Sequence, residues 1–287
     1  MPELPEVEVV RAGLAPAVVG ARVSAVSVFD ERALTRHPAG ASDFVGRLEG
    51  QGISAAERRG KFLWLPLEAG ESALTAHLGM SGQMLLRRPD ADAERHERVR
   101  IFLEHPQHGE LAVVFADQRT FGSLAVDGLV ADGPSLIPSQ VMHIARDPLD
   151  PAFDDVAFRA ALGRRNSAIK RVLLDQGVVS GIGNIYADES LWAARIHPET
   201  AAAALSTRAV NRLLAEVRAV LHKALAEGGT SFDAQYVNVN GQAGYFAHSL
   251  NAYGQHGKPC ARCGSLVVRE SFMNRGSHFC PRCQRRR

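Results

Sequence analysis

The sequence predicts a multidomain α+β protein with an N-terminal helix and β-sandwich, a helical domain, and a C-terminal four-cysteine zinc-finger β-hairpin. Three observations predict this class. Short apolar runs separated by Gly and Pro fill residues 23–126, helical periodicity dominates after about residue 150, and all four cysteines lie in the last 28 residues. At 287 residues, 46% hydrophobic and 22% charged, the chain is globular and long enough for two domains.

The first element is a helix that begins within the opening letters MPELPEVEVV. Pro5 suits the first helical position, and Glu6 and Glu8 suit the positive end of the helix dipole. Gly20 is a suitable residue to end this helix, because glycine is common just after the last helical residue. An apolar stripe follows at helical spacing and consists of Val7, Val10, Leu14 and Val18.

Residues 23–126 are predicted to form strands, because no segment with helical periodicity stands between their apolar runs. The stretch 128–155 is rich in Pro, Gly and Asp and predicts a domain boundary. The strand-like runs are KFLWLPL (61–67), MLL (84–86), VRIFLEH (99–105), LAVVFAD (111–117) and GSLAV (122–126).

Helices are predicted within 167–177, 184–196 and 206–229, the last with one apolar face and a stop at Gly228. Residues 237–254 contain three glycines and no clear period, which predicts a mobile loop. We therefore expect domains at 1–133 and 150–230, a loop segment at 231–252, and a metal-binding domain at 253–287.

The charge distribution suggests a polyanionic partner at the C-terminal end. Residues 256–287 carry eight Lys/Arg and one acid, a charge of +7, which leaves −5 for the rest of a chain whose net charge is +2. A solubilising basic tail is the alternative. No signal peptide and no membrane span are recognisable, so we expect a cytoplasmic protein.

The cysteines follow the spacing C-x2-C, sixteen residues, C-x2-C. Four thiolates in two close pairs can complete a tetrahedron around one structural Zn²⁺. Disulfides and a redox C-x-x-C are the alternatives; a reducing cytosol disfavours the first, and the absence of a βαβ pattern disfavours the second. The predicted ligands are Cys260, Cys263, Cys280 and Cys283.

Between the two cysteine pairs, LVVRESFMNRGSHF predicts two strands joined at Asn274–Arg275–Gly276. Arg275 would then lie at the hairpin tip, where a guanidinium can bind a phosphate with two hydrogen bonds. A solvated arginine in a turn is the alternative.

Several long motifs together resemble the formamidopyrimidine-DNA glycosylase family across nearly the whole chain. They are PELPEVE, RRGKF, HLGMSG, DQRTFG, AIKRVLLDQGVVSGIGNIYADE and CARCGSLVVRESFMNRGSHFCPRCQ, in that order. The resemblance implies a bacterial base-excision-repair enzyme that removes oxidised purines and then cuts the abasic strand. It also implies a β-sandwich, a helix–two-turns–helix domain and a zinc finger.

The resemblance assigns the chemistry to the N-terminus. Once Met1 is removed, the amine of Pro2 would attack the sugar C1′ and form a Schiff base. An α-amino group has a reference pKa near 8, so an appreciable fraction is neutral at pH 7. By resemblance Glu3 is the general acid/base, Glu6 a supporting carboxylate that orients the amine or a water, and Lys61 a proton donor. Without the resemblance, Glu6 would be expected only to stabilise the start of a helix, and Lys61 would be expected to be an ordinary surface lysine.

Arg275 resembles the family's zinc-hairpin arginine, which holds phosphates beside the lesion and assists δ-elimination. Rotating a base out of a duplex costs a few kcal/mol and leaves a gap. The resemblance implies that Met80, Arg119 and Phe121 fill it, since apolar side chains can insert between base steps. Without the resemblance, Met80 and Phe121 would be expected to pack on the core.

Backbone phosphate contacts are implied for further residues. Asn184 in GIGNIY would cap a helix whose N-terminal amides bind phosphate. The resemblance adds His77, His96, Lys170 and, less closely matched, Asn166. The Gly-rich loop around 241–244 would close over the extruded base, and Asp233 stands where some members are basic, so no DNA contact is transferred to it.

The sequence therefore predicts a monomeric bifunctional DNA glycosylase and abasic-site lyase. Its partner would be double-stranded DNA containing oxidised purines, such as 8-oxoguanine and formamidopyrimidines, or abasic sites. One alternative is an endonuclease VIII-like enzyme for oxidised pyrimidines; Leu4, the pair Arg119–Phe121 and the long loop after Gly229 favour the purine enzyme. The other alternative is a non-catalytic zinc-finger DNA-binding protein.

Overall fold

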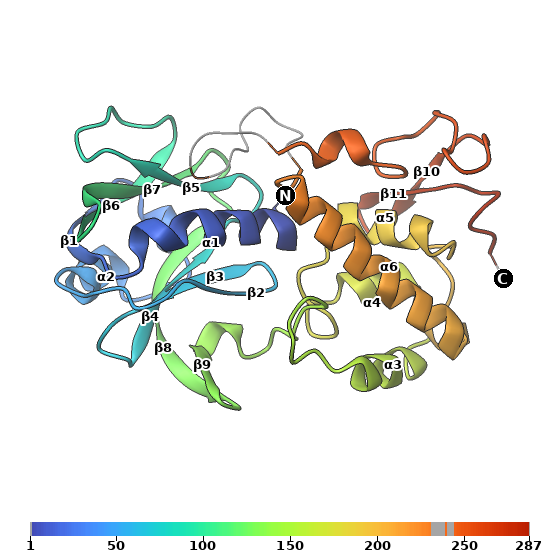
Figure 1. Ribbon diagram of the computed structural model, residues 1–287, viewed down its shortest axis with the longest axis horizontal. Helices are drawn as coiled ribbons and strands as arrows, with labels where there is room; N and C mark the ends of the chain where they lie inside the picture. Colours follow the sequence, from blue (N-terminus) through green and yellow to red (C-terminus); the bar gives the residue numbers. More distant parts are fainter. Residues whose placement is uncertain (1, 231–238, 240–243, 287) are drawn as a thin grey trace. The chain divides into compact units, whose positions relative to one another are not determined.

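The computed structural model describes residues 2–230, 239 and 244–286. They form two compact units, each described by itself below. The first unit comprises Met1–His143 and Gly228–Gly244, and the second comprises Ile144–Glu227 and Tyr245–Arg287 (Figure 1).

The first unit contains two antiparallel sheets. One has the strand order β1-β6-β7-β5 and the other the order β2-β3-β4-β8-β9. Four of the eight connections between successive strands of these sheets join strands that pair as hairpins: β2 with β3, β3 with β4, β6 with β7, and β8 with β9. The strands are β1 (Arg22–Val28), β2 (Glu57–Arg59), β3 (Phe62–Pro66), β4 (Ser72–His77), β5 (Gly82–Arg87), β6 (Glu97–His105), β7 (Gly109–Asp117), β8 (Ser123–Asp132) and β9 (Ser135–Pro138).

One hydrophobic core joins the two sheets, which confirms the predicted β-sandwich. Val99 and Phe115 from the four-stranded sheet share this core with Leu63 and Leu74 from the five-stranded sheet, and each is at most 2% exposed. Alternate residues of the longer strands point into it, for example Leu63 and Leu65 of β3 and Val113 and Phe115 of β7, as expected for a half-buried sheet. The five runs read as strands in the sequence all lie in β3, β5, β6, β7 and β8.

Helix α1 (Leu4–Val18) packs its apolar stripe into the same core. All four predicted stripe residues are buried. Leu4, and not Pro5, is the first helical residue, so Pro5 takes the second position, where its missing N–H is also tolerated. The helix ends at Val18, and Gly20 follows with φ +88°, a conformation that favours glycine.

Two features of the first unit differ from the sequence prediction. Residues Gly40–Leu48 form helix α2 inside the region expected to be all strand, with Phe44 and Leu48 buried one turn apart. A 3-10 turn, η1 (Glu31–Leu34), precedes it, and another, η2 (Ser139–Val141), follows β9. In addition, β8 runs to Asp132 and pairs with β9, so the start of the expected boundary stretch belongs to the sheet.

The second unit contains the four helices α3 (Asp155–Gly163), α4 (Ile169–Leu174), α5 (Asn184–Ala193) and α6 (Thr207–Ala226). Asp154 caps α3 and Ser206 caps α6 through their side-chain oxygens. Helix α6 ends at Ala226, two residues before Gly228, which has φ +75°. The shorter 3-10 turns are η3 (Ala202–Ala204) and η4 (Phe246–Ser249).

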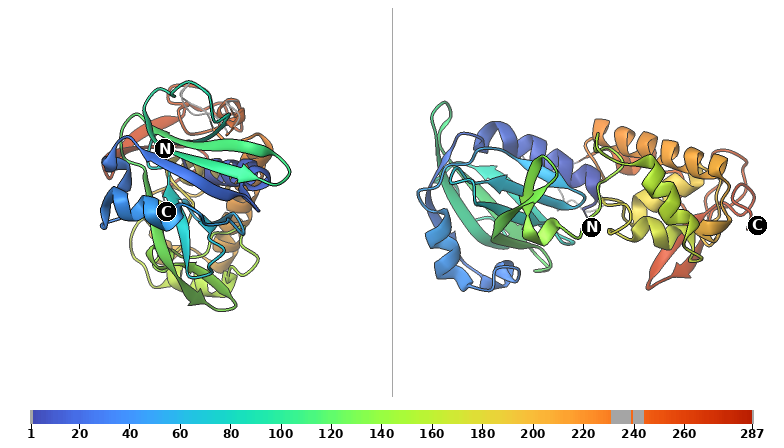
Figure 2. Two further views of the ribbon diagram at one scale, coloured as in Figure 1. Left: turned by 90° about the vertical axis from the view of Figure 1, so that its left-hand side faces the viewer. Right: turned by 90° about the horizontal axis from the view of Figure 1, so that it is seen from below.

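The hairpin of β10 (Val268–Phe272) and β11 (Arg275–Phe279) completes the second unit. Helix α5 contacts both α6 and β11, so it lies between the long helix and the hairpin (Figure 2, right). This α+β arrangement is the one that the sequence predicted. Within the part of the chain that the structure describes, no helix combines the length and apolar character required to cross a membrane.

Candidate active site and nucleic-acid interface

The N-terminal turn of α1 holds the residues expected to act on the sugar. Pro2 is buried, and Glu3 is the N-cap residue with extended backbone. Glu6 Oε2 accepts the Glu3 N–H at 2.9 Å, which completes a capping box. Glu6 Oε1 accepts the N–H and the hydroxyl of Thr230 at 2.8 and 2.9 Å. The Glu6 carboxylate thus holds the backbone next to Pro2, and its role in orienting the amine or a water stays a prediction.

Lys61 lies in the two-residue turn that joins β2 to β3. Gly60, the other turn residue, has φ +57°, and its carbonyl accepts a hydrogen bond from Arg58 Nη1 at 3.0 Å. Arg58 Nε also pairs with Glu8 of α1 at 2.9 Å. Burial opposes ionisation of Glu8, but hydrogen bonds from Arg11 and Arg58 outweigh it and lower its pKa. Glu8 therefore ties the Lys61 hairpin to the helix that begins beside Pro2.

The three residues expected to fill the gap in the DNA are exposed on two loops of the same unit. Met80 is 41% exposed and Phe121 is 57% exposed. The Arg119 guanidinium lies 5.3 Å from the centre of the Phe121 ring, within cation–π range. None of the three packs into the core, so the alternative expected from the sequence does not apply to Met80 or Phe121.

His77 is the last residue of β4 and stacks at a tilt against Phe62, with ring centres 4.8 Å apart. Its Nδ1 accepts the Gly79 N–H at 3.2 Å, so the neutral ring carries its proton on Nε2. Burial, followed by the charges of Arg36 and Lys61, lowers the pKa of His77 to about 4. His77 is thus neutral near pH 7 and would contact a phosphate by hydrogen bonding.

His96 precedes β6 in the left-handed conformation, with φ +64°. Its carbonyl accepts the Asp117 N–H at 3.0 Å. Among the described residues its Nε2 has no hydrogen-bond partner although it is buried. The ring borders a cavity of about 220 Å³ that is also lined by Ser81, Arg95 and Gln118. An unpaired ring nitrogen there suits a hydrogen bond to an external acceptor.

In the second unit, the position of Arg275 differs from the prediction. The hairpin turn consists of Met273 and Asn274, with φ +48° and +61°. Arg275 is the first residue of β11 and pairs with Phe272, so it stands beside the tip and not at its apex. Two adjacent positive φ angles are typical of a type I′ turn, which the Asn274–Arg275–Gly276 assignment misplaced by one residue. The Arg275 side chain is exposed.

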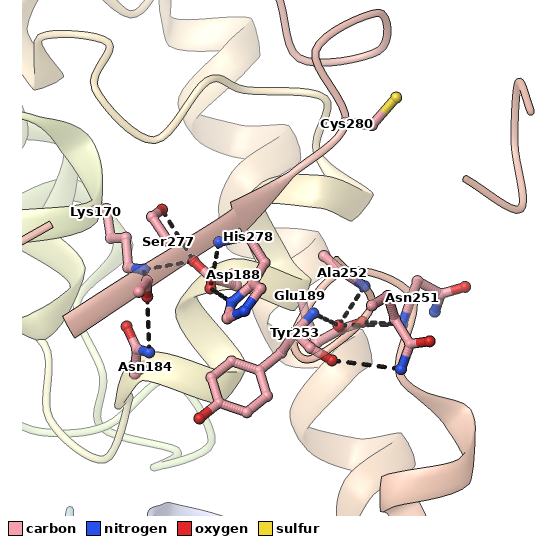
Figure 3. Close-up of polar contacts among 12 residues, drawn as sticks. Lys170, Asn184, Asp188, Glu189, Asn251, Ala252, Tyr253, Ser277, His278 and Cys280 are labelled. Atoms are coloured by element: carbon pink, nitrogen blue, oxygen red, sulfur yellow. Dashed lines mark hydrogen bonds and ion pairs between the residues drawn. The ribbon is translucent and has the colours of Figure 1, made fainter. Parts of the chain in front are cut away.

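Lys170 was expected to contact the DNA backbone, but the structure places it in the interior. Its side chain is 0% exposed, and Nζ lies 2.6 Å from Asp188 Oδ1. Nζ also donates to the Gly276 carbonyl at 3.1 Å. A lysine of α4 therefore supports the strand that carries Arg275, as Figure 3 shows.

Asn184 was expected to cap α5, but Gly183 is the N-cap and Asn184 is the first helical residue. Its Nδ2 donates to the same Gly276 carbonyl at 3.0 Å, and its Oδ1 is buried without a hydrogen-bond partner in the described part of the chain. The Asn184 amide thus holds β11 directly. Asn166 is exposed just before α4, and nothing in its surroundings bears on DNA contact.

Two carboxylates of α5 were missed from the sequence, although both lie in NIYADES. Asp188 is 1% exposed and accepts the backbone N–H of His278 at 2.9 Å and its Nδ1 at 3.1 Å. Glu189 accepts the N–H groups of Ala252 and Tyr253 at 2.7 and 2.8 Å (Figure 3). Two consecutive acids in a helix flanked by apolar residues are a signal for buried anchors of this kind.

The four cysteine sulfurs lie within 4.8 Å of one another. Two of the cysteines are buried, and Trp192 Nε1 donates to Cys260 Sγ at 3.4 Å. Four sulfurs at this separation fit tetrahedral coordination of one structural Zn²⁺, as predicted. Asp233 and most of the segment 231–243, including the Gly-rich stretch before Gly244, lie outside the described residues.

Family models match three successive segments of the chain. The formamidopyrimidine-DNA glycosylase N-terminal domain matches residues 1–124, the H2TH domain of that glycosylase matches 144–235, and the zinc finger found in FPG and IleRS matches 257–286. A Leifsonia xyli protein named formamidopyrimidine-DNA glycosylase is 64% identical and covers 99% of this chain and 100% of its own length.

The chain belongs to the formamidopyrimidine-DNA glycosylase family. A second member, from Thermobifida fusca, is 58% identical over 100% of this chain and 98% of its own. The zinc-finger match and the sulfur cluster together support a structural Zn²⁺ in this member.

Solved structures of the family match over 99% of this chain. The Lactococcus lactis Fpg bound to abasic-site DNA has a TM-score of 0.84 at 31% identity and is covered over its full length. The same protein has been solved with DNA containing Fapy-dG, with a TM-score of 0.84, and with DNA containing an oxidised pyrimidine, also at 0.84.

Proposed function

We propose that this chain excises oxidised purines from duplex DNA in base excision repair and then nicks the abasic strand. Family membership supports the reaction class, and the anchored N-terminus supports its chemistry. The single observation that carries the proposal is the Glu6 carboxylate, which holds the Glu3 N–H at 2.9 Å and so fixes the backbone next to Pro2.

In the first step, the neutral amine of Pro2 attacks C1′ and the C1′–N bond to the damaged base breaks. The Glu3 carboxyl gives its proton to the sugar ring oxygen O4′ as the C1′–O4′ bond opens, and the departing base takes up the proton lost by the amine. A cationic iminium then joins Pro2 to the opened sugar. This step requires that Met1 has been removed, because an amide nitrogen is not nucleophilic.

In the second step, the iminium acidifies the proton on C2′. Its removal expels the 3′ phosphate by β-elimination, and loss of a further proton expels the 5′ phosphate by δ-elimination. Lys61 serves as a proton donor beside the sugar, and Arg275 stabilises the departing phosphate by charge-assisted hydrogen bonds. Hydrolysis of the iminium then releases Pro2.

The remaining residues bind and distort the duplex. Met80, Arg119 and Phe121 fill the gap left by the extruded base, and their exposure supports this role. His77, His96 and Asn166 contact the backbone, and Asn184 and Lys170 hold the strand that carries Arg275. The enzyme acts as a monomer in the cytoplasm.

Borohydride trapping tests the proposal. The processed protein should form a covalent adduct with duplex DNA containing 8-oxoguanine, and a Pro2→Gly variant should bind the lesion but lose much of its lyase activity. Unchanged turnover in that variant would overturn the assignment of the nucleophile. A protein that lacks Met1, binds DNA and yields no adduct would instead support a non-catalytic zinc-finger protein.

A second candidate substrate class is the oxidised pyrimidines. The L. lactis protein solved with oxidised-pyrimidine DNA supports including them. Competition between 8-oxoguanine, a formamidopyrimidine and an oxidised pyrimidine in one set of duplexes would rank the lesions directly. Faster excision of the pyrimidine lesion would favour the endonuclease VIII-like alternative.

A further inference from the structure

Two loops of the first unit carry the exposed side chains Met80, Arg119 and Phe121. One loop joins β4 to β5, and the other joins β7 to β8. Asp117 is the last residue of β7, at the start of the second loop, and is buried with 1% of its surface exposed. Asp117 begins the motif DQRTFG, but the chemistry proposed above assigns this buried acid no role.

The Asp117 carboxylate accepts hydrogen bonds from both loops. Oδ1 accepts the hydroxyl of Ser81 at 2.5 Å and the N–H of Arg119 at 3.1 Å. Oδ2 accepts the N–H of Gly122 at 2.7 Å. The Arg119 N–H also reaches Ser81 Oγ at 3.1 Å, which closes a small ring of hydrogen bonds between the loops. One of the three donors is the backbone N–H of an exposed residue. The other two are on residues that directly follow an exposed residue in the sequence.

The backbones of the two loops are also in direct contact. Gly79 has φ +59°, and a Cβ atom there would overlap the Gly122 nitrogen. A Cβ atom on Gly122 would lie 2.8 Å from the Phe115 ring. Neither position can accept a side chain without moving its neighbours, so the glycines allow the approach and Asp117 holds it.

Asp117 also joins this region to a predicted phosphate contact. Its backbone N–H donates to the His96 carbonyl at 3.0 Å, and its own carbonyl accepts from Arg98 Nε at 2.9 Å. Asp117 is thus hydrogen-bonded to the two loops and, through its backbone, to the segment that contains His96 and Arg98.

We propose that Asp117 is a positioning residue that joins the two loops into one pre-formed wedge for base extrusion. The inference rests on the proposed function. A wedge that is already ordered loses little conformational freedom when it enters the duplex, whereas two independent loops would have to be ordered at that step. The carboxylate touches neither the sugar nor the base, so it acts through Met80, Arg119 and Phe121.

The test compares Asp117→Asn with the wild-type protein on two substrates. In asparagine an NH2 group, which donates hydrogen bonds and cannot accept them, replaces one of the two carboxylate oxygens. The loop whose donor faces this NH2 group would therefore lose its acceptor. The first substrate is a duplex with 8-oxoguanine opposite cytosine, and the second carries 8-oxoguanine in a one-nucleotide bulge. Extrusion costs less when the base is unpaired, so the wedge contributes less to the second substrate.

We expect Asp117→Asn to slow single-turnover excision of the paired lesion roughly tenfold and that of the bulged lesion less than about threefold. Asp127→Asn is the matched control, because Asp127 also accepts two hydrogen bonds, from Ser139 and Gln140, in the same unit. This control should leave the ratio of the two rates unchanged.

Ser81→Ala provides a milder second variant should Asp117→Asn fail to fold. It removes only the bridging hydroxyl and should slow the paired substrate selectively by a smaller factor. Equal slowing on both substrates, or no slowing of the paired one, would overturn the inference while wild-type activity still supports the proposed function. A wild-type protein inactive on both substrates would instead refute the proposed function.

Discussion

Lys170 and Asp188 form an ion pair in which both side chains are 0% exposed and Nζ lies 2.6 Å from Oδ1. Each partner has a further hydrogen bond within the second unit: Lys170 Nζ donates to the Gly276 carbonyl, and Asp188 Oδ2 accepts the N–H of His278. A buried charge pair with its hydrogen bonds satisfied is costly to break, because removal of one partner leaves the other charge buried alone.

Replacement of Lys170 by methionine should therefore lower the free energy of unfolding by about 3–5 kcal/mol. Chemical denaturation followed by fluorescence would measure the loss. Lys223→Met is the matched control, since Lys223 pairs with Glu227 at 3.8 Å on the exposed side of α6. That change should cost less than about 1 kcal/mol. Similar losses for both variants would contradict the interior role of Lys170.

His77 should bind DNA as a neutral ring. Its pKa of about 4 lies below the ordinary value of 6.5, so the folded state favours the uncharged form. The resulting stability is fully present above pH 6.5 and is lost as the pH falls toward 4. We expect the ring NMR signals of His77 not to titrate between about pH 6 and 8. A His77 midpoint above about pH 6 would refute this.

Thr230 should assist catalysis by holding Glu6. Thr230→Val removes the hydroxyl that donates to Glu6 Oε1 at 2.9 Å but keeps the side-chain shape. A small displacement of the Pro2 backbone is expected to slow adduct formation roughly tenfold. Borohydride trapping under single-turnover conditions would measure it. Thr230→Ser retains the hydroxyl and should recover most of the rate; failure of this recovery would argue against the anchor.

Removal of the metal should unfold the hairpin before the sandwich. The core around the cysteines contains little besides Cys260, Val267 and Cys280, so metal binding would supply much of its folding free energy. Under a chelator, amide hydrogens of β10 and β11 should exchange fast while those of β6 and β7 remain protected. DNA affinity should fall roughly tenfold or more as the phosphate contacts are lost. Full affinity in the metal-free protein would exclude a role for the hairpin.

Arg275→Ala should reduce the slope of log affinity against log salt by about 1, as expected for one phosphate contact. It should also shift the products from δ- to β-elimination, which gel analysis of the cleaved strand would show. Arg269→Ala is the control on the partner strand, where Arg269 is exposed and pairs with His278. A normal product ratio for Arg275→Ala would contradict its assigned step.

Local patterns in the sequence predicted the elements because those elements depend on local spacing. The short apolar runs in VRIFLEH and LAVVFAD predicted two strands, and the valine and leucine stripe predicted α1. The cysteine spacing likewise predicted the sulfur cluster. Helix α2 was missed because it is only nine residues long and buries only Phe44 and Leu48 fully, which is too short a pattern to separate from a strand.

The sequence by itself determined most of the secondary structure, the predicted metal ligands and the family motifs, since each of these depends on residues that are close together in the chain. Only the tertiary structure decided that Lys170 is an interior cation, that Arg275 stands beside its turn, and that Thr230 and Asp117 are anchors. These facts depend on the approach of separate segments of the chain. A buried charge or carboxylate acquires its role from the donors and acceptors that folding brings within hydrogen-bond distance.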